Sequence, residues 1–114
     1  MRVLIADDDT FFLRVLVKRL SAAGHEVSTA TTGAEASAAL VSFAPEVAIL
    51  DVSLPLGDGA SVAAQWAGPV LFLSARDLDR AEGPSAGPRA HLQKPVDLDA
   101  VVAAVEALGR GERP

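Results

Sequence analysis

Several short apolar runs in this chain are followed at once by residues that can do chemistry. In a parallel sheet the carboxyl ends of the strands meet along one edge, so strands formed by these runs would bring the polar residues into one pocket. Clustered carboxylates repel one another, and a bound cation removes that conflict. An oxygen ligand set without Cys or His favours Mg²⁺, or Mn²⁺. The polar residues after the runs are Asp7, Asp8, Asp9, Asp51, Ser74 and Lys94.

Phosphoryl transfer is the chemistry that this set of residues suits. A carboxylate can act as a nucleophile, and Asp51 would then form an aspartyl phosphate. The metal would meet one side of the transferred group, while Lys94 binds a second oxygen and Ser74 donates a hydrogen bond to a third. Each residue alone has an ordinary explanation, such as a helix cap for Asp9, a turn for Ser74 and a solvated charge for Lys94. The combination is more specific than any member.

The strands that must position these residues are predicted from short runs rich in Val, Leu and Ile. They cover residues 3–6, 47–50 and 70–73, with weaker candidates at residues 26–30 and 90–92. Continuous apolar runs of this length are typical of strands that are buried on both faces of a parallel sheet. The sequence therefore predicts five strands, with the acidic residues at the ends of the first and the third.

Segments of helical periodicity lie between the strands. A short helix is predicted at residues 60–66, and the Gly/Pro-rich stretch Gly83 to Pro88 leaves room only for a short helix or a loop. Alternation of strand and helix predicts an α/β fold, a doubly wound five-stranded parallel sheet flanked by helices, with the fourth helix short or irregular. The better marked helices are predicted between Asp9 and Gly24, between Thr32 (in a capping box with Glu35) and Pro45, and between Asp97 and Gly109.

Composition limits the classes of protein that this chain can be. Its 114 residues suit one domain, predicted at residues 1–109, with residues 110–114 as a tail or the start of a linker. The net charge of -5 argues against direct nucleic-acid binding and against an anionic membrane, and no apolar run is long enough to span a bilayer. Because there is no cysteine and no signal peptide, a cytoplasmic location is expected.

The motifs resemble those of the receiver domain of bacterial response regulators (CheY-like), the phosphoacceptor module of two-component systems. The similarity extends over nearly the whole chain and rests on the acidic run after the first strand, D-V-S-L-P-L-G-D-G at residues 51–59, S-A at 74–75 and K-P at 94–95. It implies a flavodoxin-like fold and phosphorylation of Asp51 by the phosphohistidine of a sensor histidine kinase or phosphotransfer protein. A downstream protein partner or an effector domain would respond. Such a domain is not an enzyme beyond assisting its own phosphorylation and dephosphorylation.

The resemblance also implies a metal site. Asp7, Asp8 and Asp51 would hold Mg²⁺, and Ser53 would supply its backbone carbonyl to the same ion. The side chains of Ser53 and Arg76 match positions that tune dephosphorylation in the family. Ordinary loop polarity is an equal explanation for both side chains.

The remaining expected roles concern the phosphoryl group and the switch. Ser74 would move toward the phosphoryl group, Lys94 would contact it, and the Lys94–Pro95 peptide bond would be cis. His91 stands where receivers usually carry the Tyr or Phe that changes rotamer on activation, so we expect either an altered switch or a partly buried structural histidine. The stretch Gly83 to Pro88 departs from the family on the face through which receivers usually signal.

Three other functions are compatible with parts of the sequence. A receiver-fold interaction module that works without phosphorylation is the main alternative, because His91 and the Gly83 to Pro88 stretch depart from the family. An aspartyl-phosphate hydrolase would need a second acid two residues after the nucleophile, where this chain has Ser53. Flavin binding suits the fold alone, but the crowded carboxylates would repel an FMN phosphate.

Overall fold

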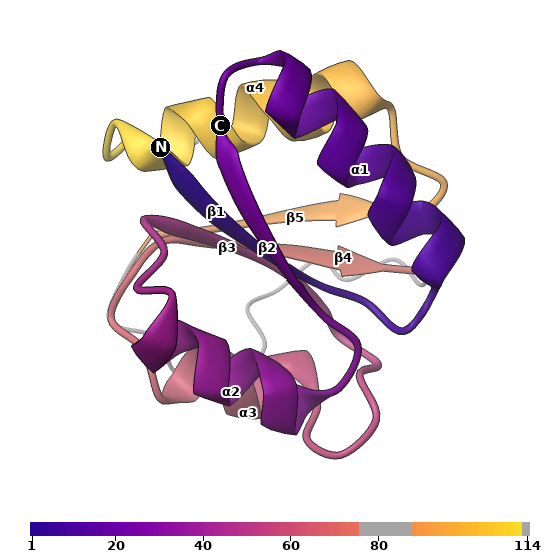
Figure 1. Cartoon of the computed structure of the whole chain (residues 1–114), viewed down its shortest axis with the longest axis vertical. Coiled ribbons are helices and arrows are strands. Elements are labelled where there is room, and N and C mark those ends of the chain that lie inside the picture. The colour runs from indigo at the N-terminus through magenta and orange to yellow at the C-terminus, as the bar shows by residue number, and fades with distance from the viewer. Residues whose placement is uncertain (76–87, 113–114) are drawn as a thin grey trace.

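The computed structural model describes residues 1–75 and 88–112. These residues form one parallel sheet of five strands in the order β2-β1-β3-β4-β5, with helices packed on both faces (Figure 1). The predicted doubly wound parallel sheet is therefore confirmed, including its two weaker strands. In chain order the elements are β1 (Arg2–Ala6), α1 (Thr10–Ala22), β2 (Glu26–Ala30), α2 (Gly33–Ser42), β3 (Val47–Asp51), α3 (Gly59–Ala64), β4 (Val70–Ser74), β5 (Arg89–Gln93) and α4 (Leu98–Gly109).

The central strands are apolar throughout because both faces of the sheet are covered. Side chains of β1 alternate between two cores: Val3 and Ile5 pack under α1 and α4, whereas Leu4 and Ala6 pack against α2 and α3. Figure 1 shows α1 and α4 together on one face and α2 and α3 on the other. A strand with one polar face would leave unpaired polar groups in one of these cores, which explains the continuous apolar runs in the sequence.

The order of the strands reverses between β1 and β3. The chain leaves β1 for the edge strand β2 and then returns to β3 on the opposite side of β1. Ala6 is the register partner of Leu50. The next residues, Asp7 and Asp51, therefore lie side by side at the ends of two neighbouring strands. In open α/β sheets this point of reversal is where the loops diverge and leave a crevice for a ligand.

Side-chain caps fix where the helices begin. The carboxylate of Asp9 accepts hydrogen bonds from the backbone N–H groups of Phe11 and Phe12, both at 3.1 Å, and starts α1. The carboxylate of Asp97 accepts the N–H of Asp99 at 2.8 Å and starts α4. Both caps were predicted from the sequence, because a short oxygen-bearing side chain before an apolar helical stripe satisfies the free N–H groups of the first turn.

The predicted ends of two helices are also found. Thr32 caps α2 by accepting the N–H of Glu35 at 3.1 Å, and the Glu35 carboxylate accepts the N–H and the hydroxyl of Thr31, at 2.7 and 3.0 Å, besides a hydrogen bond with the backbone of Thr32. Helix α4 ends at Gly109, as predicted, and Gly111 follows with a φ of 81°.

Some sequence predictions concern residues outside the described ranges. The Gly/Pro-rich stretch lies there except for Pro88, so the short or irregular fourth helix predicted from it is not part of the structure described. Among the helices within the described residues, none combines the length and the apolar character needed to cross a bilayer.

Two glycines fix the loop between β3 and α3 against the start of α2. The N–H of Gly33 donates a hydrogen bond to the carbonyl of Pro55 at 2.8 Å. A Cβ atom on Gly33 would overlap the carbonyl group of Gly57. Gly57 itself has a φ of 108°, a conformation that side chains disfavour. Backbone thus packs directly on backbone here, which holds the loop that follows Asp51.

We predict that Gly33→Ala destabilises the protein although alanine is the better helix former. The added methyl has no space and must push the backbone of Gly57 away, which we expect to cost about 2 kcal/mol or more. The free energy of unfolding, measured by urea denaturation, is the readout. Ala34→Gly at the neighbouring exposed position is the control, with an expected loss of no more than about 1 kcal/mol. An unchanged stability of Gly33→Ala would contradict the close packing.

Candidate functional site

Two buried carboxylates lie side by side at the carboxyl ends of β1 and β3. Asp7 is 1% exposed and Asp51 is 5% exposed, in a chain whose other described acidic residues lie nearer to solvent. The exposed Asp8 completes a cluster, in which one carboxylate oxygen from each of the three residues lies within 4.8 Å of the others. The site therefore gathers three acids that the sequence predicted to be neighbours.

Backbone N–H groups orient the two buried carboxylates. Asp7 Oδ1 accepts the N–H of Asp9 at 3.0 Å, and Asp51 Oδ1 accepts the N–H of Ser53 at 3.1 Å. Both bonds span two residues, so the chain turns sharply after each strand and presents the side chain to its own following loop. The N–H of Val52 also donates to Leu73 on β4 at 3.0 Å, which extends the sheet beyond Asp51.

Lys94 supplies the cation of the site. Its Nζ donates a hydrogen bond to Asp7 Oδ2 at 2.7 Å and lies 3.6 Å from Asp51 Oδ2. The backbone N–H of Lys94 donates to the carbonyl of Ser74 at 2.6 Å, which ties the end of β5 to the end of β4. The peptide bond between Lys94 and Pro95 is cis. The ammonium group is thus held between two carboxylates from neighbouring strands.

Burial and charge act against each other in this site. Burial raises the pKa of Asp7, and the hydrogen bond from Lys94 offsets only part of that effect. For Lys94, burial opposes the charged form, but the hydrogen bond and charge of Asp7 with the charge of Asp51 outweigh it and raise the pKa. Lys94 is therefore an ammonium at neutral pH. This single positive charge lies beside the three carboxyl groups of Asp7, Asp8 and Asp51.

The donor set fits a hard divalent cation. Asp7, Asp8 and Asp51 offer oxygen atoms only, which suits Mg²⁺ or Mn²⁺.

Two serines lie near Asp51 in the chain and the sheet, Ser74 at the end of β4 and Ser53 on the loop after β3. Ser74 ends β4 and is only 4% exposed, and its neighbour Leu73 is the register partner of Asp51. Ser53 lies two residues after Asp51 and is exposed. A buried hydroxyl therefore lies on the β4 side of Asp51, and a solvent-facing hydroxyl lies on the loop. Arg76 lies outside the described residues.

His91 lies within β5 and is half-buried. Its ring stacks on that of Phe72, the register partner on β4, with the ring centroids 5.1 Å apart and an angle of 22° between the planes. The guanidinium of Arg89 also lies over the Phe72 ring, 5.6 Å from its centroid. His91 is thus packed on the core that α2 and α3 cover, whereas Lys94, after the strand end, reaches the acidic cluster.

Sequence reasoning missed two residues that shape the site. The ring of Phe12 lies 5.0 Å from Lys94 Nζ and contributes a cation–π contact, which nothing in the local sequence of α1 indicates. Gly59 begins α3, and a Cβ there would come within 2.5 Å of the carbonyl oxygen of Asp51. The glycine that ends the motif at residues 51–59 was a possible signal for that close approach, because a residue without a Cβ atom lets other backbone come near.

Comparison with known proteins gives consistent matches. The sequence model of the response regulator receiver domain matches residues 3–106. The transcriptional regulatory protein PrrA of Mycobacterium tuberculosis is 40% identical over 116 residues, and PhoP of Escherichia coli K12 is 35% identical over 117 residues. Each alignment covers 96% of this chain and 50% or 52% of the relative, so the chain spans about half the length of these proteins.

A solved structure shows the same fold. The signal receiver domain of the putative response regulator NarL from Mycobacterium tuberculosis is 31% identical, with a TM-score of 0.82 and 97% of each chain covered. The family model, the relatives and the fold agree with the motifs at residues 51–59, 74–75 and 94–95, so the resemblance noted from the sequence is confirmed. The chain belongs to the response regulator receiver domain family, the signalling module of two-component systems.

Proposed function

We propose that this domain is a magnesium-dependent phosphoacceptor switch in which Asp51 takes a phosphoryl group from a sensor histidine kinase or a phosphotransfer protein. The observation that carries the proposal is the buried Asp51 carboxylate, flanked by Asp7 and Asp8 and lying 3.6 Å from the Lys94 ammonium. A buried nucleophile next to further acids and a cation is expected where a highly charged group is received.

In the proposed reaction a carboxylate oxygen of Asp51 attacks the phosphorus of a phosphohistidine. The P–O bond forms as the P–N bond breaks, and the imidazole leaves with the electron pair and takes up a proton. Mg²⁺ or Mn²⁺, held by Asp7, Asp8, Asp51 and the backbone carbonyl of Ser53, would neutralise charge on the transferred group. The Ser53 N–H, which donates to Asp51 Oδ1 at 3.1 Å, holds the carboxylate in one orientation.

Lys94 and Ser74 would receive the charge of the transferred group. Lys94 Nζ already lies between the two buried carboxylates, and a short movement brings it to a phosphoryl oxygen on Asp51. Ser74 ends the neighbouring strand, and its hydroxyl would turn toward another phosphoryl oxygen. The movement of Ser74 would shift the end of β4, whose Ser74 carbonyl accepts the backbone N–H of Lys94. This shift is how the phosphoryl group would alter the surface.

The remaining roles extend the same proposal. The side chains of Ser53 and Arg76 would tune dephosphorylation, and His91 would replace the aromatic switch residue, with its stack on Phe72 as the contact that changes. The receiver unit would cover residues 1–109, with residues 110–114 leading toward an effector domain or a separate protein partner, in the cytoplasm. The expectation of no direct nucleic-acid binding rests on net charge alone, and relatives of about twice this length that are named transcriptional regulators give it no support.

We predict that acetyl phosphate with Mg²⁺ adds one phosphoryl group to the wild-type protein and none to Asp51→Asn. Intact-mass spectrometry measures the addition. Asp58→Asn is the matched control, since Asp58 lies on the same loop and asparagine also caps a helix. Equal labelling of the wild type and Asp51→Asn would sink the proposal and favour a receiver-fold module that acts without phosphorylation. Catalytic turnover of phosphate esters would instead indicate a hydrolase.

We predict that Lys94→Met binds Mg²⁺ more tightly than the wild type, by roughly tenfold, because it removes a cation that competes for Asp7 and Asp51. The Mg²⁺-dependent rise in Tm should accordingly be larger. The same variant should hold a phosphoryl group or beryllofluoride less well. Lys18→Met, which changes the chain's other lysine on the surface of α1, should match the wild type in both measurements. Weaker Mg²⁺ binding by Lys94→Met would contradict the proposed competition.

A further inference from the structure

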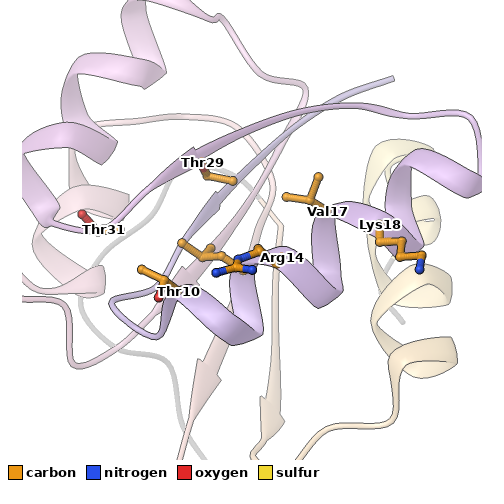
Figure 2. A pocket seen from close by; sticks show the side chains of 7 residues that line it. Thr10, Arg14, Val17, Lys18, Thr29 and Thr31 are labelled. Atoms are coloured by element: carbon orange, nitrogen blue, oxygen red, sulfur yellow. The ribbon is translucent and has the colours of Figure 1, made fainter.

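A groove runs between α1 and the edge strand β2, away from the acidic cluster. Its volume is about 540 Å³. None of the residues proposed for phosphoryl transfer lines it. Figure 2 shows Val17 pointing from α1 toward β2, Thr29 on the strand side, and Arg14 along the flank of the helix. The lining residues are Thr10, Leu13, Arg14, Val17, Lys18, Thr29 and Thr31.

The strand side of the groove has backbone groups that point outward. In the described residues β2 pairs only with β1. The N–H of Glu26 bonds to Met1 and the carbonyl of Ala30 accepts the N–H of Asp7, both at 3.0 Å, so alternate β2 residues beginning with Glu26 face β1. By the alternation of a β ladder, the N–H and C=O groups of Val27 and Thr29 point away from the sheet. An added strand could bond to them.

The helix side of the groove has apolar side chains toward the core and positively charged side chains toward solvent. Leu13 is buried and Val17 is partly buried, while Arg14 and Lys18 are exposed and one helical turn apart. Within the described ranges neither cation forms an ion pair, and no acidic residue lines the groove. The helix side of the groove thus carries two positive charges in a chain whose net charge is -5, and the carboxylate of Glu35 is bonded to Thr31 on the strand side.

We propose that the groove between α1 and β2 docks an extended acidic and apolar segment of a partner protein, which adds to the sheet as a strand beside β2. The outward backbone groups of Val27 and Thr29 would bond to the segment, its apolar side chains would cover Val17, and its carboxylates would pair with Arg14 and Lys18. A helix would leave the strand groups unused, and two exposed cations over an apolar floor offer little to nucleic acid.

The direct test is selection of random short peptides displayed on phage against the purified wild-type protein. We expect the selected peptides to be enriched in Asp and Glu alternating with apolar residues. A selected peptide should protect the amide protons of Val27 and Thr29 from hydrogen exchange. N-methylation of those backbone amides of the peptide that face β2, which are every second amide, should abolish its binding to the wild-type protein. This measurement does not depend on any variant folding.

Charge reversal tests the helix side of the same groove. Arg14→Glu with Lys18→Glu should weaken peptide binding by about tenfold or more. Arg2→Glu with Arg110→Glu makes the same change in net charge on exposed residues outside the groove and should change binding by less than about twofold.

Three results would overturn the proposal. The first is equal binding of the peptide to both double variants. The second is full binding of the N-methylated peptide. The third is displacement of the peptide by inorganic phosphate at low concentration, which would indicate a small-anion site instead.

Discussion

The structure depends on keeping two carboxylates, Asp7 and Asp51, buried next to each other. Two like charges with little access to water are costly unless a cation and hydrogen-bond donors compensate them. Here the compensation comes from three parts of the chain: the backbone N–H groups after β1 and β3, and the Lys94 ammonium after β5. The relative position of the strand ends is therefore set by charge as well as by packing.

This constraint also suits the proposed chemistry. Three carboxyl groups beside one ammonium form a site that would suit the divalent cation of the proposed function. In the proposed function that cation would take the place of the Lys94 ammonium beside Asp7, and the ammonium would then be available to a phosphoryl oxygen. The same residue would thus stabilise the resting site and the phosphorylated site. When Lys94 changes partner, the effect would reach β4 through the hydrogen bond from the backbone N–H of Lys94 to the carbonyl of Ser74.

Helix α1 borders both surfaces considered above. Its cap, Asp9, donates its backbone N–H to Asp7 in the acidic cluster, and Phe12 lies over the Lys94 ammonium. Further along the helix, Val17 and Arg14 form one wall of the groove beside β2. Leu16 and Leu20 pack α1 as one rigid element on the core. The two surfaces therefore have a fixed position relative to each other. Each surface can nevertheless be altered separately, since they share no side chain.

The sequence by itself determined the elements and the end of the sheet at which chemistry is expected. Apolar runs buried on both faces predicted the strands, Asp9 and Asp97 predicted helix starts, and the strand-terminal position of Asp51 predicted the acceptor, because each of these follows from neighbours in the chain. Only the tertiary structure decided the contacts between distant segments. Lys94 meets Asp7 across 87 positions, His91 stacks on Phe72, and α1 lies beside the outer edge of β2. These contacts depend on strand order and register, which local patterns do not encode.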